Sequence, residues 1–181
     1  AVLASAAWVT TPVEMVANAS GDATPLRFAN VDAEFYGFDM DFGSVIAGPL
    51  RIDGVVSYTR GQRRDITDNL YRIAPLNGRV SLGWMADGWS LAFEAAGFAK
   101  QNKVSVTNGE AASKGYALFH LKGGFDVNSQ IRIDAGVENL FDKHYVEHLA
   151  GYNRISGSDV ALGARLPGAG RSGFVRVNVR Y

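Results

Sequence analysis

The last eight residues of the chain, FVRVNVRY, alternate strictly between apolar and polar side chains after their first residue. The apolar positions are Val175, Val177, Val179 and Tyr181. Alternation with a period of two predicts a strand whose two faces meet different surroundings. Such a strand suits a soluble sandwich, where the apolar face meets a core. It equally suits an outer-membrane barrel, where that face meets lipid and the polar face meets a wet lumen.

Most of the chain repeats this pattern, and no segment predicts a convincing helix. The clearest predicted strands are Leu50–Tyr58, Val80–Trp84, Trp89–Ala99, Phe119–Phe125, Ile131–Val137 and Val175–Tyr181. A long strand is predicted over Arg27–Phe42, and a weaker one over Ala4–Ala17. Within the long strand the apolar phase changes after Gly37, which predicts a β-bulge at that glycine.

The segments between the predicted strands alternate between short and long. The short segments are GSVIAG, MADGW and DVNSQ, and much longer polar segments separate them. A meander whose long loops all fall at one end is typical of outer-membrane barrels, which have short periplasmic turns and long external loops. The pattern therefore favours an all-β antiparallel meander of about eight membrane-spanning strands.

Aromatic residues gather where the short turns and the C-terminus are expected to meet. Those that share the apolar face of their strands are Phe42, Trp84, Trp89, Phe125 and Tyr181. Aromatic rings favour the boundary between membrane and water, so these residues predict a girdle at the periplasmic side. At the opposite end Tyr58 is the only clear member. The competing explanation is that aromatic residues simply favour strands.

Composition narrows the classes of function. The 181 residues carry 18 basic and 18 acidic side chains, which gives no footprint for nucleic acid. There is no cysteine, and no apolar run approaches the ~20 residues of a membrane helix. The opening AVLASAAW has neither a methionine nor a basic stretch, so a complete signal peptide is not expected and the chain reads as a fragment.

One segment resembles a known family. VENLFDKHYVEHL is similar to the region near the C-terminus of TonB-dependent outer-membrane receptors, where an Asn-Leu-Phe-Asp run ends the penultimate strand. The matching residues are Asn139, Leu140, Phe141, Asp142 and Tyr145. FANVDAEFYGFDMDF also resembles a strand of this family, with Asn30 and Gly37 at the family's spacing. EHL and YRIAPLNGRVSL are similar, more weakly, to the copper-receptor subgroup.

The resemblance implies a 22-stranded barrel with an N-terminal plug, energised through TonB, that takes up scarce metals or metal chelates. Residues 1–181 would supply only the last eight or so strands, without the plug and without the region that contacts TonB. The implied partners are outer-membrane lipid, the rest of the barrel and its plug, TonB through the missing N-terminal region, and a metal or chelate. No cofactor is implied. Tyr181 replaces the family's usual terminal phenylalanine.

Two groups of residues are candidates for substrate contact. His144 and His148 stand four apart with Glu147 between them, which at helical spacing could hold a metal. They equally suit the polar start of an external loop. Basic residues in predicted external loops are candidates for contact with an anionic chelate, unless they are merely solvated. These are Arg60, Arg63, Arg64 and Arg154.

The sequence leaves several classes of function to compare. An enzyme is least supported, because no nucleophile stands in a recognisable catalytic arrangement. A complete eight-stranded outer-membrane barrel with a structural or adhesive role is the main alternative, and such a barrel is too narrow for an open channel. A lipocalin-like binding protein would need an apolar interior. The predicted inward face, which includes Asp32, Glu34, Arg132 and Asp134, is too charged for that.

Overall fold

The computed structural model describes residues 2–5, 13–16 and 27–180. Its strands are β1 (Val2–Ser5), β2 (Val13–Val16), β3 (Arg27–Asn30), β4 (Ala33–Ala47), β5 (Leu50–Arg63), β6 (Asn77–Ala86), β7 (Trp89–Phe98), β8 (Tyr116–Asp126), β9 (Ile131–Glu138) and β10 (Ser172–Val179). Within these ranges no helix is long and apolar enough to cross a membrane.

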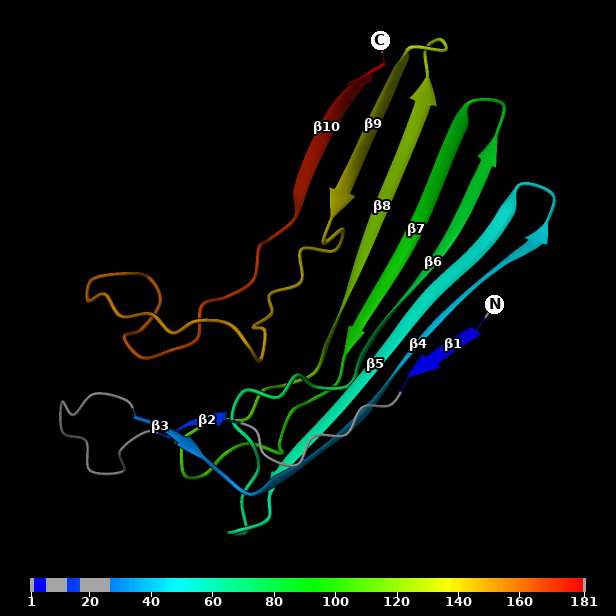
Figure 1. Ribbon diagram of the computed structural model, residues 1–181. Helices are drawn as coiled ribbons and strands as arrows, with labels where there is room; N and C mark the ends of the chain where they lie inside the picture. The colour runs from blue at the N-terminus through cyan, green and yellow to red at the C-terminus, as the bar shows by residue number, and fades with distance from the viewer. Residues whose placement is uncertain (1, 6–12, 17–26, 181) are drawn as a thin grey trace.

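One large antiparallel sheet carries most of the structure (Figure 1). Strands β4 to β10 follow one another in chain order as a meander, and β1 pairs with the outer edge of β4 to complete eight strands. β2 and β3 form a separate two-stranded sheet. The predicted all-β antiparallel meander is confirmed. The sheet is open, since β1 and β10 are its two edges, so the described chain does not form the closed small barrel of the alternative hypothesis.

The connections of the meander alternate in length as predicted. The short ones comprise residues 48–49, 87–88 and 127–130, and the long ones comprise 64–76, 99–115 and 139–171. All the short turns lie at the end of the sheet where the chain terminates (Figure 1). In the turn between β6 and β7, Asp87 and Gly88 both have positive φ, 51° and 78°, which suits the tight twist of a two-residue hairpin.

Three predictions about the first half of the chain are wrong in detail. Arg27–Phe42 is divided between β3 and β4, which belong to different sheets. The segment GSVIAG is mostly strand, because β4 continues to Ala47. The Ala4–Ala17 candidate contains the end of β1 and all of β2, which belong to different sheets, and its remainder lies outside the described residues.

The bulge predicted at Gly37 is also wrong. Gly37 pairs with Thr59 in unbroken register, and the irregularity lies instead between Val45 and Ala47. A Cβ atom at Gly37 would lie 2.3 Å from the carbonyl oxygen of Tyr58, so the close approach of the backbones explains the glycine.

The apolar phase changes because part of the concave face is covered at the loop end. Val31, Ala33 and Leu70 form the buried hydrophobic cluster, with Phe35 and Ile73 packed against it. Leu70 and Ile73 come from the connection between β5 and β6. Unbroken register then places Glu34 on the opposite, outward face, contrary to the prediction that it faces inward.

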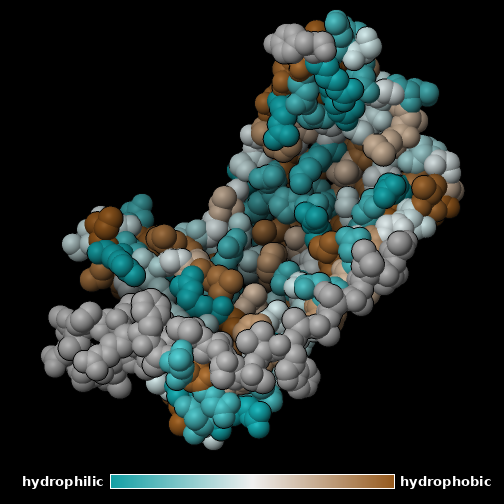
Figure 2. Space-filling view, viewed as in Figure 1, coloured by the Kyte–Doolittle hydropathy of each residue, from teal (hydrophilic) through white to brown (hydrophobic). Residues whose placement is uncertain are grey.

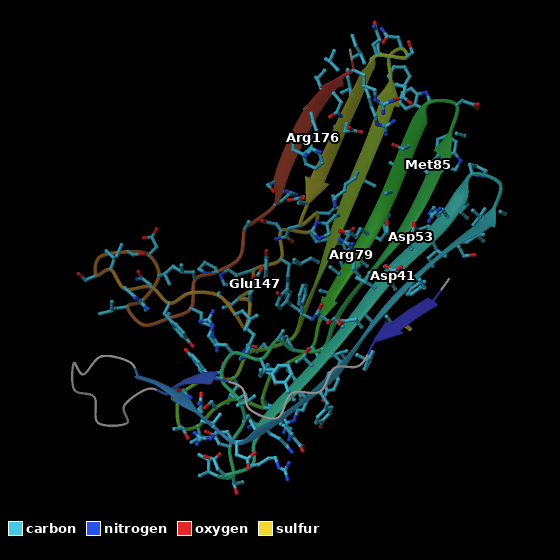
Figure 3. The ribbon with its side chains drawn as sticks, viewed as in Figure 1. Asp41, Asp53, Arg79, Met85, Glu147 and Arg176 are labelled. Carbon is cyan, nitrogen blue, oxygen red and sulfur yellow. The ribbon has the colours of Figure 1, made fainter. Side chains whose placement is uncertain are left out.

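The two faces of the sheet differ sharply. Outward positions leave large apolar side chains exposed, including Leu82, Leu91, Val175 and Val177, the last of these 59% exposed. The concave face is hydrophilic (Figure 2), and Asp41, Asp53, Arg79 and Arg176 project from it (Figure 3). An exposed apolar face over a polar interior is the arrangement of a membrane barrel wall.

Candidate functional site

The concave face is lined by charged side chains that pair across neighbouring strands. Glu94 on β7 lies 3.6 Å from Arg79 on β6 and 3.5 Å from Lys122 on β8. Nearer the short-turn end, Arg132 on β9 lies 3.1 Å from Asp126 and 2.8 Å from Asp134. The charges are largely balanced within this face, so it forms a hydrated surface suited to lining a polar lumen.

The long connections above this face are tied together at Asp68. Its carboxylate accepts hydrogen bonds from the backbone N–H groups of Val106 (2.8 Å) and Thr107 (2.9 Å) and from Ser105 Oγ (3.1 Å). Burial of Asp68 raises its pKa, but the hydrogen bonds from Thr107, Val106 and Asn69 outweigh that effect and lower the pKa to about 2. Asp68 therefore holds connection 99–115 against connection 64–76 as an ionised group.

A second tie is fully buried. The side chains of Glu110 and His148 are each 1% exposed, and Nε2 of His148 lies 3.2 Å from Oε1 of Glu110. The Glu110 carboxylate also accepts the backbone N–H groups of Arg72 and Ser105, both at 2.9 Å. Arg72 has a φ of 61°, an unusual value for a residue other than glycine. In this conformation its backbone N–H donates to Glu110.

The environment of His148 disfavours its charged form. Burial lowers the pKa of His148 below 6.5; Glu110 opposes this shift, and Arg165 and Arg72 reinforce it. On the other side of the ring, Ser113 Oγ lies 3.0 Å from Nδ1. His148 thus joins connections 99–115 and 139–171 as a neutral, buried group.

These two connections enclose a cleft of about 520 Å³. Its cationic and aromatic lining comprises Lys114, Lys143, His144, Tyr116, Tyr145, Tyr152 and Arg165. Arg165 donates to the backbone oxygens of Ala111 and Ala112 and lies over the ring of Tyr152, 5.5 Å from its centroid. The lining carries several positive groups and no carboxylate, which suits an anionic ligand with planar or apolar parts.

Stacked aromatic rings support one wall of the cleft. Tyr116 lies between Phe98 and Tyr145, with ring centroids 4.7 and 4.8 Å away. Tyr145 in turn packs on the backbone of Gly168, where an added Cβ would lie only 2.1 Å from the ring. Tyr145 therefore holds the return of the last connection close to β8.

The Asn-Leu-Phe-Asp segment forms the turn by which the chain leaves β9. Asn139 is 3% exposed, with a φ of 48°, and its Nδ2 donates to the backbone oxygens of Lys143 (2.9 Å) and Ala169 (3.1 Å). Asp142 accepts the backbone N–H of Arg171 at 2.8 Å. Leu140 N–H bonds Phe119 O at 2.7 Å, and the exposed Phe141 ring packs edge-on against Phe119. These contacts anchor both ends of connection 139–171.

The structure does not bring His144 and His148 together as metal ligands. The segment between them is not helical, His144 is exposed in the cleft, and His148 is buried against Glu110 and Ser113. Over the ranges that the structure describes, no three His, Cys, Asp or Glu side chains form a group able to hold a metal ion.

The predicted arginines fall in three different places. Arg60 and Arg63 belong to β5, not to the external loop, because β5 extends to residue 63. Arg63 pairs with Asp65, its Nε lying 2.9 Å from Oδ1. Arg64 and Arg154 are exposed in the long connections. None of the four lines the cleft.

The predicted girdle residues lie on the outward face, and Tyr181 lies outside the described residues. Trp84, Trp89 and Phe125 line one apolar groove near the short turns, where the Trp89 and Phe125 rings are 4.3 Å apart. Phe42 shares their face but lies further from the turn, opposite Gly54. At the other end Tyr58 is not alone, because Phe38 lies 5.9 Å from it and Phe119 lies between Phe93 and Phe141.

Comparison with known proteins decides the family. The family model described as "TonB dependent receptor-like, beta-barrel" matches residues 9–140. The chain belongs to the TonB-dependent receptor family. Members of this family are outer-membrane transporters and not enzymes, as the sequence predicted.

Solved TonB-dependent receptors share the fold of this chain. The copper transporter OprC is 24% identical, with a TM-score of 0.88 over 98% of this chain. The ferric enterobactin receptor PfeA of Pseudomonas aeruginosa is 20% identical, with a TM-score of 0.69. The FrpB iron transporter of Neisseria meningitidis is 15% identical, with a TM-score of 0.68. Both also match over 98% of this chain. The chain spans 28% of the length of each of these three proteins. No curated protein sequence matches the chain significantly.

Proposed function

We propose that residues 1–181 form the C-terminal segment of a TonB-dependent receptor barrel whose full-length form takes up a metal as an anionic chelate. The rest of the barrel would pair with β1 and β10, a plug would fill the space over the concave face, and TonB would act through a region N-terminal to this chain. Copper is one candidate metal, supported by the likeness to the copper transporter OprC.

The cleft between the last two long connections carries this proposal. Lys114, Lys143 and Arg165 supply positive charge, and the tyrosines supply flat surfaces against which a ligand can pack. A chelate bearing carboxylate or phenolate oxygens matches this lining better than a bare cation, which the lysines and the arginine would repel. The ties at Asp68 and Glu110 would keep the cleft in shape before the ligand arrives.

An uptake assay tests the proposal. Cells that lack the receptor would be complemented with the full-length protein and supplied with radiolabelled copper or iron, each as the free ion and as an anionic chelate. We expect uptake of a chelate that depends on TonB and on the receptor. Uptake of the free ion alone would contradict the proposed substrate class.

Paired variants distinguish the cleft from the predicted arginines. Lys114→Gln with Lys143→Gln removes two cleft charges, whereas Arg64→Gln with Arg154→Gln removes two exposed loop charges. Each charge-assisted hydrogen bond contributes about 1.5–3 kcal/mol, so we expect the lysine pair to raise the half-saturating chelate concentration at least tenfold. A loss confined to the arginine pair would instead support the assignment made from sequence.

A further inference from the structure

A second, smaller cleft lies at the loop end of β5, apart from the cleft between connections 99–115 and 139–171. It encloses about 180 Å³ between the end of β5, residues 73–76 and residues 99–103. Its walls are held together by Ala99 N–H donating to Leu76 O at 2.8 Å and by Gln101 Nε2 donating to Ile73 O at 3.0 Å. Gln101 is buried and also accepts the backbone N–H of Lys103 at 3.0 Å, so the cleft is a built feature of the fold.

Three cations line this cleft without a carboxylate among them: Arg60, Lys100 and Lys103. None of the ion pairs formed within the described ranges includes any of the three. Arg60 Nη2 donates to Gln62 Oε1 at 3.3 Å, and Gln62 in turn donates to Glu34. Glu34 thus bonds to an amide and not to Arg60, and the lining of the cleft keeps an unbalanced positive charge.

The position of the cleft identifies its ligand. Tyr58 and Arg60 have the outward parity of β5, so they project from the face opposite the polar lumen. Next to Arg60 along β5, the half-buried Tyr58 packs against Phe38, which begins the exposed apolar surface of the sheet. The cleft also lies within the sheet, away from the edges at β1 and β10 where further strands would pair.

We infer that this cleft binds a phosphate group on the headgroup of an anionic glycolipid in the outer leaflet. A phosphate fits the volume and needs positive donors of this kind. The acyl chains of the same lipid would cover the apolar surface below. Basic pockets that border a lipid-facing surface recognise anionic headgroups in this way. The inference rests on the proposed function, which requires the long loops to lie on the outer side of the membrane.

Binding of lipid A to the full-length receptor in detergent tests the inference. The probe is fluorescent diphosphoryl lipid A, followed by anisotropy. Each Lys or Arg near a charged surface contributes about a fivefold gain in affinity, so we expect R60Q/K100Q/K103Q to weaken binding roughly a hundredfold. The control R64Q/R154Q/R171Q removes three exposed charges that line neither cleft and should change affinity less than threefold. Equal affinity of the first variant and the wild type would overturn the inference.

Two further arms identify the source of the phosphate. Monophosphoryl lipid A should bind more weakly than the diphosphoryl form, and inorganic phosphate at matched concentration should not displace either. Displacement by inorganic phosphate would show a free-anion site and refute the lipid assignment. Should the triple variant fail to show the heat-modifiable migration of a folded barrel, K100Q/K103Q replaces only exposed side chains and should weaken binding roughly thirtyfold.

Chelate uptake separates this inference from the proposed function. The triple variant should retain uptake, because none of the three side chains lines the cleft proposed for the chelate. Wild-type receptor that binds lipid A through these residues but shows no uptake would refute the proposed function alone. If the receptor takes up chelate but its affinity for lipid A is unchanged by the three substitutions, the inference alone is refuted.

Discussion

Asp68→Asn should release the connection between β7 and β8 from the rest of the loop assembly. The Asp68 carboxylate accepts four hydrogen bonds, from the backbone N–H groups of Asn69, Val106 and Thr107 and from Ser105 Oγ. An asparagine retains one acceptor oxygen and presents an NH₂ group to the remaining donors. At least one hydrogen bond to a charged acceptor is lost, and a donor faces a donor.

The size of the loss follows from the hydrogen bonds to Asp68 and from the pKa shift that they cause. Losing a hydrogen bond to a charged group costs about 1.5–3 kcal/mol. The pKa of Asp68 falls from 3.8 to about 2, which corresponds to about 2.5 kcal/mol of preference for the ionised form in the docked loop. Both figures describe the same hydrogen bonds, and the docked state of the connection should lose about 2 kcal/mol.

Hydrogen exchange measures this loss directly. In the full-length receptor, amides of residues 104–110 should exchange about 30-fold faster in Asp68→Asn than in the wild type, while β8 is unchanged. Asp65→Asn is the control, because Asp65 lies in the same connection but pairs with Arg63 as an exposed carboxylate, where ion pairs contribute little. Unchanged exchange in Asp68→Asn, or equal acceleration in the control, would refute the reasoning.

Three other results are expected. Val177→Arg should block membrane assembly, because an arginine facing lipid near mid-bilayer costs about 2–4 kcal/mol. Asn178→Arg on the inward face should assemble, and equal yields of the two variants in outer-membrane fractions would show that the faces are misassigned. Protease added to intact cells should cut within residues 149–170 and spare 127–130, and the reverse would invert the topology. Because burial lowers the pKa of His148, the undocked loop takes up protons first as pH falls through 6.5. Protection of the amides around this residue, each measured relative to its intrinsic exchange rate at the same pH, should therefore fall from pH 7.5 to 5.5. Unchanged protection would place the pKa of His148 at its ordinary value.

The sequence predicted the repetitive part of the fold well, because strand alternation and loop lengths are local properties. The meander, the end where short turns gather and the outward position of Val177 all follow from them. The errors arose where distant residues intervene. Leu70 covers Val31 and Ala33 from another connection, so apolar residues there face inward and imitate a bulge at Gly37.

The candidate site was less accessible from the sequence, because its contacts join residues far apart in the chain. Nothing near Asp68 or Glu110 distinguishes them from other loop acids, yet both tie separate connections together. The spacing of His144 and His148 suggested a metal site only on the assumption of a helix, and that segment is irregular. The Asn-Leu-Phe-Asp motif was informative, and its role as a turn anchor became visible only in the contacts of Asn139.

The central claim is that this sheet is a membrane wall with lipid on one side and a polar lumen on the other. Spin labels attached at single cysteines, Arg176→Cys and Val177→Cys, test it in the full-length receptor in bilayers, since the chain has no cysteine of its own. We predict that the label at 177 collides mainly with dissolved oxygen and the label at 176 mainly with a water-soluble nickel chelate. Equal accessibility at both sites, or the opposite order, would contradict the account.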